Sequence, residues 1–236
     1  MAYICQSTFY MRQTFEINFV DGHLLIRDNG NTILIDTGSP VTVHSGNVLN
    51  FLGREFAVST SIMGSGVGTL CELSGVEFDT LLGMDIMSQY KVIFDYGNSK
   101  LTFLSEDEAD VAGTAYPLMD VMGVKALEMR IGGKALRMAI DTGAPLSYVD
   151  TAVTAGMEPV GEREDFHPLA GRYVTRIFKL DAEFAGKQFP GTYGNLPGLM
   201  GMSLKLGGLD GVVGYDFFKS FKVMFDFRDG VAVVGE

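Results

Sequence analysis

The 236-residue sequence has no tryptophan, only two cysteines and no long apolar run. Cys5 and Cys71 are too few for a disulfide framework, which favours a reducing compartment. Residues 1–6 show no basic leader followed by an apolar stretch, and no segment approaches the about 18 apolar residues of a membrane span. The sequence therefore predicts a cytoplasmic chain that does not enter a membrane.

Positive charge is also scarce. Eighteen Lys and Arg face 29 Asp and Glu, which gives a net charge of −11 and a pI near 4.7. Because nucleic acids and anionic membranes repel such a surface, neither is expected as a partner. The hydrophobic content of 47% is typical of a globular protein, and 30 glycines indicate the many tight turns of an all-β fold.

One short pattern occurs twice. Residues 33–40 read Ile-Leu-Ile-Asp-Thr-Gly-Ser-Pro, and residues 138–145 read Met-Ala-Ile-Asp-Thr-Gly-Ala-Pro. Each apolar run predicts a strand covered on both faces, and the glycine permits a tight turn directly after it. Asp36 and Asp141 thus stand where core strands end. Because a lone buried carboxylate is costly, the two aspartates are expected to meet and share a function.

A second repeated pattern follows each aspartate. Leu-Leu-Gly-Met-Asp at 81–85 continues to a Lys-Val-Ile-Phe-Asp run, and Val-Val-Gly-Tyr-Asp at 212–216 continues to Lys-Val-Met-Phe-Asp. The offset is 105 at the aspartates (141 minus 36) and 131 at the glycines (214 minus 83), so the second half has 26 additional residues. We expect these in residues 190–211. The other repeated acids are interpreted as turn or cap residues: Asp85, Asp95, Asp216 and Asp226.

Together these motifs resemble the pepsin-like and retropepsin-like aspartic peptidases, from about residue 14 to residue 234. That family carries an apolar strand, Asp-Thr-Gly and a downstream apolar-apolar-Gly segment once in each lobe or subunit. The resemblance implies an all-β acid-protease fold with two pseudo-symmetric lobes around a central cleft. An acidic stretch, residues 105–110, predicts the linker between an N-terminal lobe (1–108) and a C-terminal lobe (109–236).

The resemblance also implies an activity. Asp36 and Asp141 would form a catalytic dyad that shares one proton and activates a water for endoproteolytic cleavage of an extended peptide. No cofactor or metal is expected, and the chain should act as a monomer. Two alternatives stay open: a catalytically inactive peptide-binding or scaffold protein of the same fold, and a processing enzyme with a single protein substrate.

The residues beside the dyad have supporting roles in the family. Each threonine hydroxyl bonds to the backbone of the opposite lobe, and each glycine presents an N–H to a carboxylate. The two copies differ at the next position, where a hydroxyl on Ser39 donating to Asp36 would leave Asp141 as the holder of the shared proton. The supporting residues are Thr37, Gly38, Ser39, Thr142, Gly143 and Ala144.

A hairpin that closes over the substrate, the flap, is the last family element. A glycine-rich hairpin tip is predicted at residues 62–68, which an ordinary surface hairpin would also explain, and a rival hairpin is predicted at residues 166–175. Both could be flaps, and the candidate flap residues are Met63, Gly64, Ser65, Gly66, Pro168, Leu169 and Tyr173. The three histidines have no metal-ligand spacing, so metal chemistry is not expected.

Overall fold

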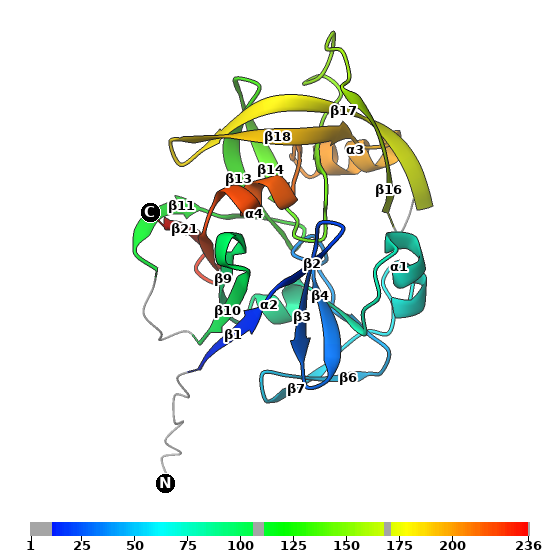
Figure 1. Cartoon of the computed structure of the whole chain (residues 1–236), viewed down its shortest axis with the longest axis vertical. Helices are drawn as coiled ribbons and strands as arrows, with labels where there is room; N and C mark the ends of the chain where they lie inside the picture. Colours follow the sequence, from blue (N-terminus) through cyan, green and yellow to red (C-terminus); the bar gives the residue numbers. More distant parts are fainter. Residues whose placement is uncertain (1–10, 106–110, 168–170, 236) are drawn as a thin grey trace.

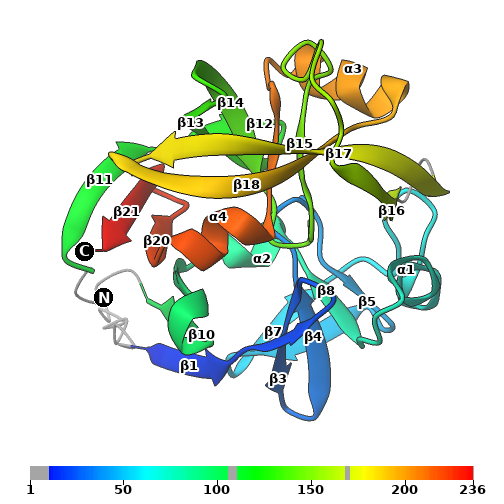
Figure 2. The ribbon, with the colours of Figure 1, turned by 45° about the horizontal axis from the view of Figure 1, so that its top comes forward.

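The computed structural model describes residues 11–105, 111–167 and 171–235. Strands dominate it and the helices are short, which confirms the predicted all-β fold (Figures 1 and 2). The predicted lobe boundary at residue 108 lies outside the described residues. Within the described ranges, no helix is long and apolar enough to cross a membrane.

The first half builds a five-stranded sheet in the order β2-β3-β4-β8-β5. A tight Asn-Gly turn joins β3 and β4, with Asn29 and Gly30 both at positive φ. A two-stranded sheet and helix α1 complete this half. The elements are β2 (Asn18–Val20), β3 (His23–Asp28), β4 (Asn31–Ile35), β5 (Val43–His44), β6 (Val48–Phe51), β7 (Arg54–Ala57), α1 (Val67–Ser74) and β8 (Thr80–Leu82).

The second half repeats this plan in a larger sheet of eight strands, in the order β12-β13-β14-β19-β15-β18-β17-β16. Its long strands β17 and β18 curve across the upper part of the molecule (Figure 1). The elements are β12 (Met119–Val121), β13 (Val124–Ile131), β14 (Lys134–Ile140), β15 (Ser147–Val149), β16 (Gly161–His167), β17 (Gly171–Phe184), β18 (Lys187–Asn195), α3 (Gly198–Leu206) and β19 (Gly211–Val213).

A third sheet joins the halves, in the order β1-β10-β9-β20-β21-β11. At its centre β9 of the first half pairs antiparallel with β20 of the second. Each repeated lysine forms an ion pair with the repeated aspartate of the other half. Lys91 pairs with Asp226 at 3.5 Å, and Lys222 pairs with Asp95 at 3.0 Å. The elements are β1 (Arg12–Glu16), β9 (Lys91–Asp95), β10 (Lys100–Leu104), β11 (Gly113–Pro117), β20 (Val223–Asp226) and β21 (Val231–Gly235), with α2 (Met84–Met87), the 3-10 turn η1 (Tyr96–Asn98) and α4 (Tyr215–Ser220).

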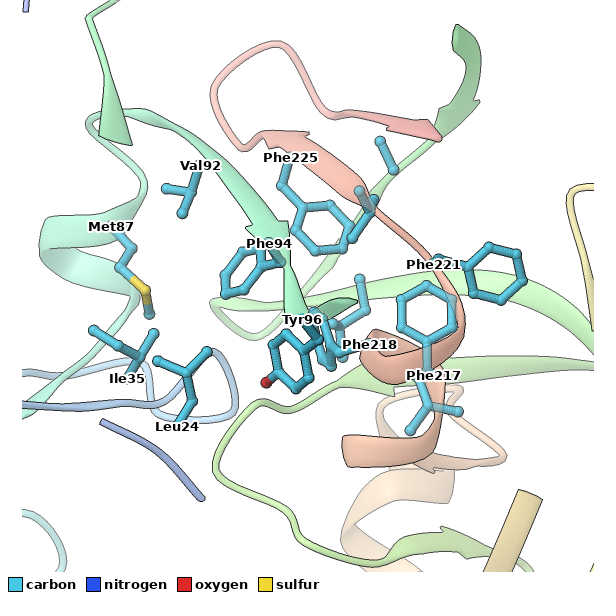
Figure 3. Packing of buried hydrophobic residues seen from close by; sticks show 14 of the residues in the cluster. Leu24, Ile35, Met87, Val92, Phe94, Tyr96, Phe217, Phe218, Phe221 and Phe225 are labelled. Atoms are coloured by element: carbon cyan, nitrogen blue, oxygen red, sulfur yellow. The ribbon is translucent and has the colours of Figure 1, made fainter. Parts of the chain in front are cut away.

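The main core lies where this joining sheet meets the two half sheets. Phe94 of β9 packs against Phe218 of α4 and Phe225 of β20, with ring centroids 5.1 and 5.6 Å apart (Figure 3). All three rings are fully buried. The aromatic cluster therefore belongs to both halves, and burial of such rings is a large stabilising contribution.

The sequence predicted that the additional residues of the second half lie in 190–211, but in the structure they are not confined to that stretch. Between β5 and β8 the first half has residues 45–79, 35 in number; between β15 and β19 the second has residues 150–210, 61 in number. The longer segment holds the three strands β16 to β18 as well as α3, whereas the shorter holds only β6, β7 and α1. Both segments thus contain a strand hairpin and a helix, and the enlargement lies mainly in one additional strand and in the greater length of the strands.

Candidate functional site

Equivalent strands deliver the two aspartates. β4 runs parallel to β8 and β14 runs parallel to β19, so each apolar-apolar-Gly segment lies beside the strand that ends in an aspartate. The Asp36 N–H donates to the Leu82 carbonyl at 3.0 Å, and the Asp141 N–H donates to the Val213 carbonyl at 2.9 Å. Two central strands of different sheets therefore fix where each aspartate loop begins.

The threonines tie the two loops together reciprocally. Thr37 Oγ1 donates to the Ile140 carbonyl at 2.9 Å and accepts the Thr142 N–H at 3.0 Å. Thr142 Oγ1 donates to the Ile35 carbonyl at 2.7 Å and accepts the Thr37 N–H at 3.0 Å. Because both threonines are fully buried, these four bonds have no competition from water and hold the loops in one relative position.

The glycines allow the carboxylates to approach each other. The Gly38 N–H donates to Asp36 Oδ1 at 2.9 Å, and the Gly143 N–H donates to Asp141 Oδ1 at 2.8 Å. A Cβ on Gly38 would lie 2.4 Å from Asp141 Cγ, and one on Gly143 would lie 2.7 Å from Asp36 Cγ. Each glycine is thus covered by the opposite aspartate, so the two carboxyl groups lie close enough for each to alter the pKa of the other.

Burial raises the pKa of both carboxyl groups. For Asp141 the pKa lies well above its ordinary range, since the negative charge of Asp36 and that of Asp165 add to burial. For Asp36 the hydrogen bond with Asp141 and the N–H groups of Gly38 and Ser39 oppose the effect of burial. Both side chains keep partial exposure to solvent. When the pair holds a single proton, these surroundings favour Asp141 over Asp36 as its holder.

The Ser39 hydroxyl does not have the role expected from the sequence. It donates to the Val41 carbonyl at 2.8 Å, and a hydroxyl has only one proton to donate. Its N–H, a group that every residue but proline supplies, is what reaches Asp36. The Ser39 hydroxyl therefore does not account for the higher pKa of Asp141, which comes from burial and from the nearby charges of Asp36 and Asp165.

The first flap prediction was wrong in its shape. Ile62 and Ser65 pair across a two-residue turn, with Met63 and Gly64 at positive φ, but no second long strand follows. Gly66 instead caps helix α1. Glycine and serine, as at 64–66, are common both at the start of a helix and at the tip of a hairpin, which is why the pattern was misread.

The rival hairpin does form. β16 and β17 pair antiparallel from Gly161 with Ile177 to His167 with Gly171, and Tyr173 lies on β17. The candidate residues Pro168 and Leu169 lie outside the described residues. Helix α1 of the first half lies beside this β16–β17 hairpin (Figure 2). Arg172 Nη2 donates to the Glu72 carbonyl of α1 at 3.0 Å, so the hairpin bridges the two halves.

Sequence reasoning did not select two residues close to this site, Tyr148 and Asp165. Tyr148 follows Asp141 by seven positions, on β15, and is buried; Asp165 is on β16 and bonds to its hydroxyl. Only the pairing register of the hairpin, which the sequence does not reveal, brings them together.

Among the described residues no cluster of His, Cys, Asp or Glu is arranged to hold a metal ion. Two cavities of about 400 and 200 Å³ lie beside α3, and neither Asp36 nor Asp141 lines them.

No protein-family model and no curated protein matches the chain. Among solved structures, the solution structure of the simian foamy virus (mac) protease is similar over 38% of this chain and 86% of its own, with 17% sequence identity and a TM-score of 0.29. The foamy viral protease-reverse transcriptase in complex with an RNA/DNA hybrid is similar over 39% of this chain and 11% of its own, with 14% identity and a TM-score of 0.29. The chain thus spans about a tenth of that second protein's length.

Proposed function

We propose that the chain is an aspartic endopeptidase whose dyad is Asp36 and Asp141. The observation that supports this most is the reciprocal set of Thr37 and Thr142 bonds, which joins two equivalent loops and sets their carboxyl groups side by side. An arrangement built only for stability would gain nothing from two half-buried carboxylates placed side by side, because each raises the cost of ionising the other.

The chemistry follows from the unequal pair. Charged Asp36 accepts a proton from a water held between the carboxyl groups, and that water attacks the scissile carbonyl. Protonated Asp141 donates a hydrogen bond to the carbonyl oxygen and stabilises its developing negative charge. The proton then passes to the leaving amine as the tetrahedral intermediate collapses, so no covalent bond to the enzyme forms.

The β16–β17 hairpin is proposed as the flap. It belongs to the second half, contacts α1 of the first, and carries Tyr173 close enough to Asp141 for that charge to affect its pKa. An extended peptide would lie between the hairpin and the dyad, with its backbone bonding to the hairpin as an added strand.

Cleavage of a mixed peptide library from about pH 3 to about pH 7.5 tests the proposal. Wild type should cleave, and Asp36→Asn and Asp141→Asn should each lose at least about a thousandfold in kcat/KM, because each removes one member of a unit. Asp181→Asn, an exposed aspartate on β17, is the matched control and should keep full activity.

A folded wild-type chain that cleaves nothing in the library at any pH would contradict a general endopeptidase and favour a peptide-binding protein or a processing enzyme with a single protein substrate. Cleavage that survives either active-site substitution would contradict it as well, because the hydrolysis would then come from another site or a contaminant.

A further inference from the structure

The β16–β17 hairpin is the edge of the sheet that carries Asp141, and a chain of side-chain hydrogen bonds also joins it to strand β15 of that sheet. Tyr173 and Asp165 face each other in the hairpin register. The Tyr173 hydroxyl donates to the Tyr148 hydroxyl at 3.1 Å, and the Tyr148 hydroxyl donates to Asp165 Oδ2. Tyr148 belongs to β15, which directly follows the Asp141 loop. We call this chain of two hydrogen bonds, Tyr173 to Tyr148 to Asp165, the relay. It begins and ends on the hairpin, and its middle member, Tyr148, belongs to β15.

The direction of the relay depends on the charge of Asp165. Its second oxygen, Oδ1, accepts the Phe166 N–H at 2.8 Å, so a charged carboxylate uses both oxygens as acceptors. The two tyrosines remain donors at every working pH, because burial raises the pKa of Tyr173 to about 12 and that of Tyr148 further still. A protonated or amide side chain at 165 would weaken this order.

Asp165 is close enough to several titratable groups on neighbouring elements to alter their pKa values. Its negative charge raises the pKa of His23, on β3 of the first half. In the second half it raises the pKa of His167, on β16, and that of Asp141. The positive charge of Arg163, on β16, lowers the pKa of His23. Asp165 thus lies where the hairpin, the first half and the dyad come together.

We propose that Asp165 is a positioning residue which, through the hydroxyls of Tyr148 and Tyr173, holds the β16–β17 hairpin in its place beside Asp141. The proposal rests on the endopeptidase function for its effect on rate, but the positioning itself does not depend on catalysis. Its negative charge has a second consequence, because it helps to keep the proton on Asp141.

Two substitutions separate these effects. Asp165→Asn removes the charge and weakens the relay, whereas Tyr148→Phe breaks the relay and keeps the charge. Glu162→Gln is the matched control, since it neutralises an exposed acid on the same strand. We measure amide hydrogen exchange over residues 161–184 without substrate, and kcat, KM and the pH profile of kcat/KM with a cleaved peptide.

Both relay variants should exchange about tenfold faster than the control in this segment and lose about tenfold or more in kcat/KM. Only Asp165→Asn should move the basic limb of the pH profile, to lower pH, because the like charge beside Asp141 is gone. Exchange equal to that of Glu162→Gln would overturn the proposal, and a loosened hairpin with unchanged kcat/KM would overturn its effect on rate. If the wild-type chain cleaves nothing, the endopeptidase function fails, and the exchange measurement alone decides whether Asp165 positions the hairpin.

Discussion

Residues 45–79 of the first half and residues 150–210 of the second occupy equivalent places after the aspartate loops, yet they differ in length and in structure. The first segment forms a short hairpin and α1; the second forms three strands and α3. The loops themselves, by contrast, agree bond for bond at Thr37 and Thr142. Each loop is bonded to the other half, so a change in one disturbs both, whereas the outer segments can differ freely.

Filling the space between the two loops should have the largest effect. Gly38→Ala and Gly143→Ala each place a Cβ within 2.4 to 2.7 Å of the opposite carboxyl carbon, which forces the aspartates apart. We expect a loss of at least about a hundredfold in kcat/KM from either, because such displacement misplaces the attacking water. Gly68→Ala in α1, where a Cβ meets nothing within 4 Å, is the control for a peptidase assay and should be fully active.

Removing one threonine hydroxyl should cost stability equally in the two halves. Thr37→Ala and Thr142→Ala each delete one buried donor and one buried acceptor, which predicts a decrease of about 2 to 3 kcal/mol in the free energy of unfolding. Denaturant unfolding measures it, and Thr37→Ser, which keeps the hydroxyl, should stay near wild type. A clear difference between the two alanine variants would break the equivalence of the loops.

The crossed ion pairs of the joining sheet should be unequal. Lys91 has a side chain 13% exposed, whereas that of Lys222 is 46% exposed. Lys91→Met should therefore lower the free energy of unfolding by about 2 kcal/mol, since it leaves Asp226 buried without this cation, and Lys222→Met by less than about 1 kcal/mol. Equal losses in thermal or denaturant unfolding would show that burial does not distinguish the pairs.

The dyad itself should lower stability at neutral pH. A carboxyl group whose pKa is raised in the folded state binds more protons there, so the stability it contributes is present at acidic pH and decreases as pH rises through the raised pKa of Asp141. Asp141→Asn should consequently increase the free energy of unfolding at pH 7, by on the order of 1 kcal/mol, and make it less dependent on pH. A decrease at pH 7 would contradict this assignment; Asp181→Asn should leave the pH dependence unchanged.

Making the two loops identical should have the smallest effect. In Ala144→Ser the new hydroxyl is expected to donate to a backbone carbonyl, as Ser39 does to Val41, and not to Asp141. The acidic limb of the pH–rate profile should therefore stay where it is in wild type. A limb that moves downward would restore the role that the sequence assigned to the serine hydroxyl.

The sequence was informative where local pattern and position coincide. The repeated strand-Asp-Thr-Gly motif places Asp36 and Asp141 without any knowledge of pairing, because a strand end and a tight turn are local features. The joining of β9 to β20 and the meeting of Tyr148 with Asp165 depend on register between distant strands, which no local pattern encodes. The glycines at 62–68 were ambiguous, because the following residues, Val67–Ser74, form a helix whose buried side chains, Leu70 and Cys71, pack against distant strands of the five-stranded sheet.

The central claim is that Asp36 and Asp141 form one titrating unit. The most direct test is a carbon-13 NMR titration of the aspartate carboxyl groups, in wild type and in Asp36→Asn, which needs no substrate. The account predicts a pKa for Asp141 well above the ordinary aspartate range, decreasing when the Asp36 charge is removed. An Asp141 that titrates in the ordinary range, or that does not respond to Asp36→Asn, would contradict it.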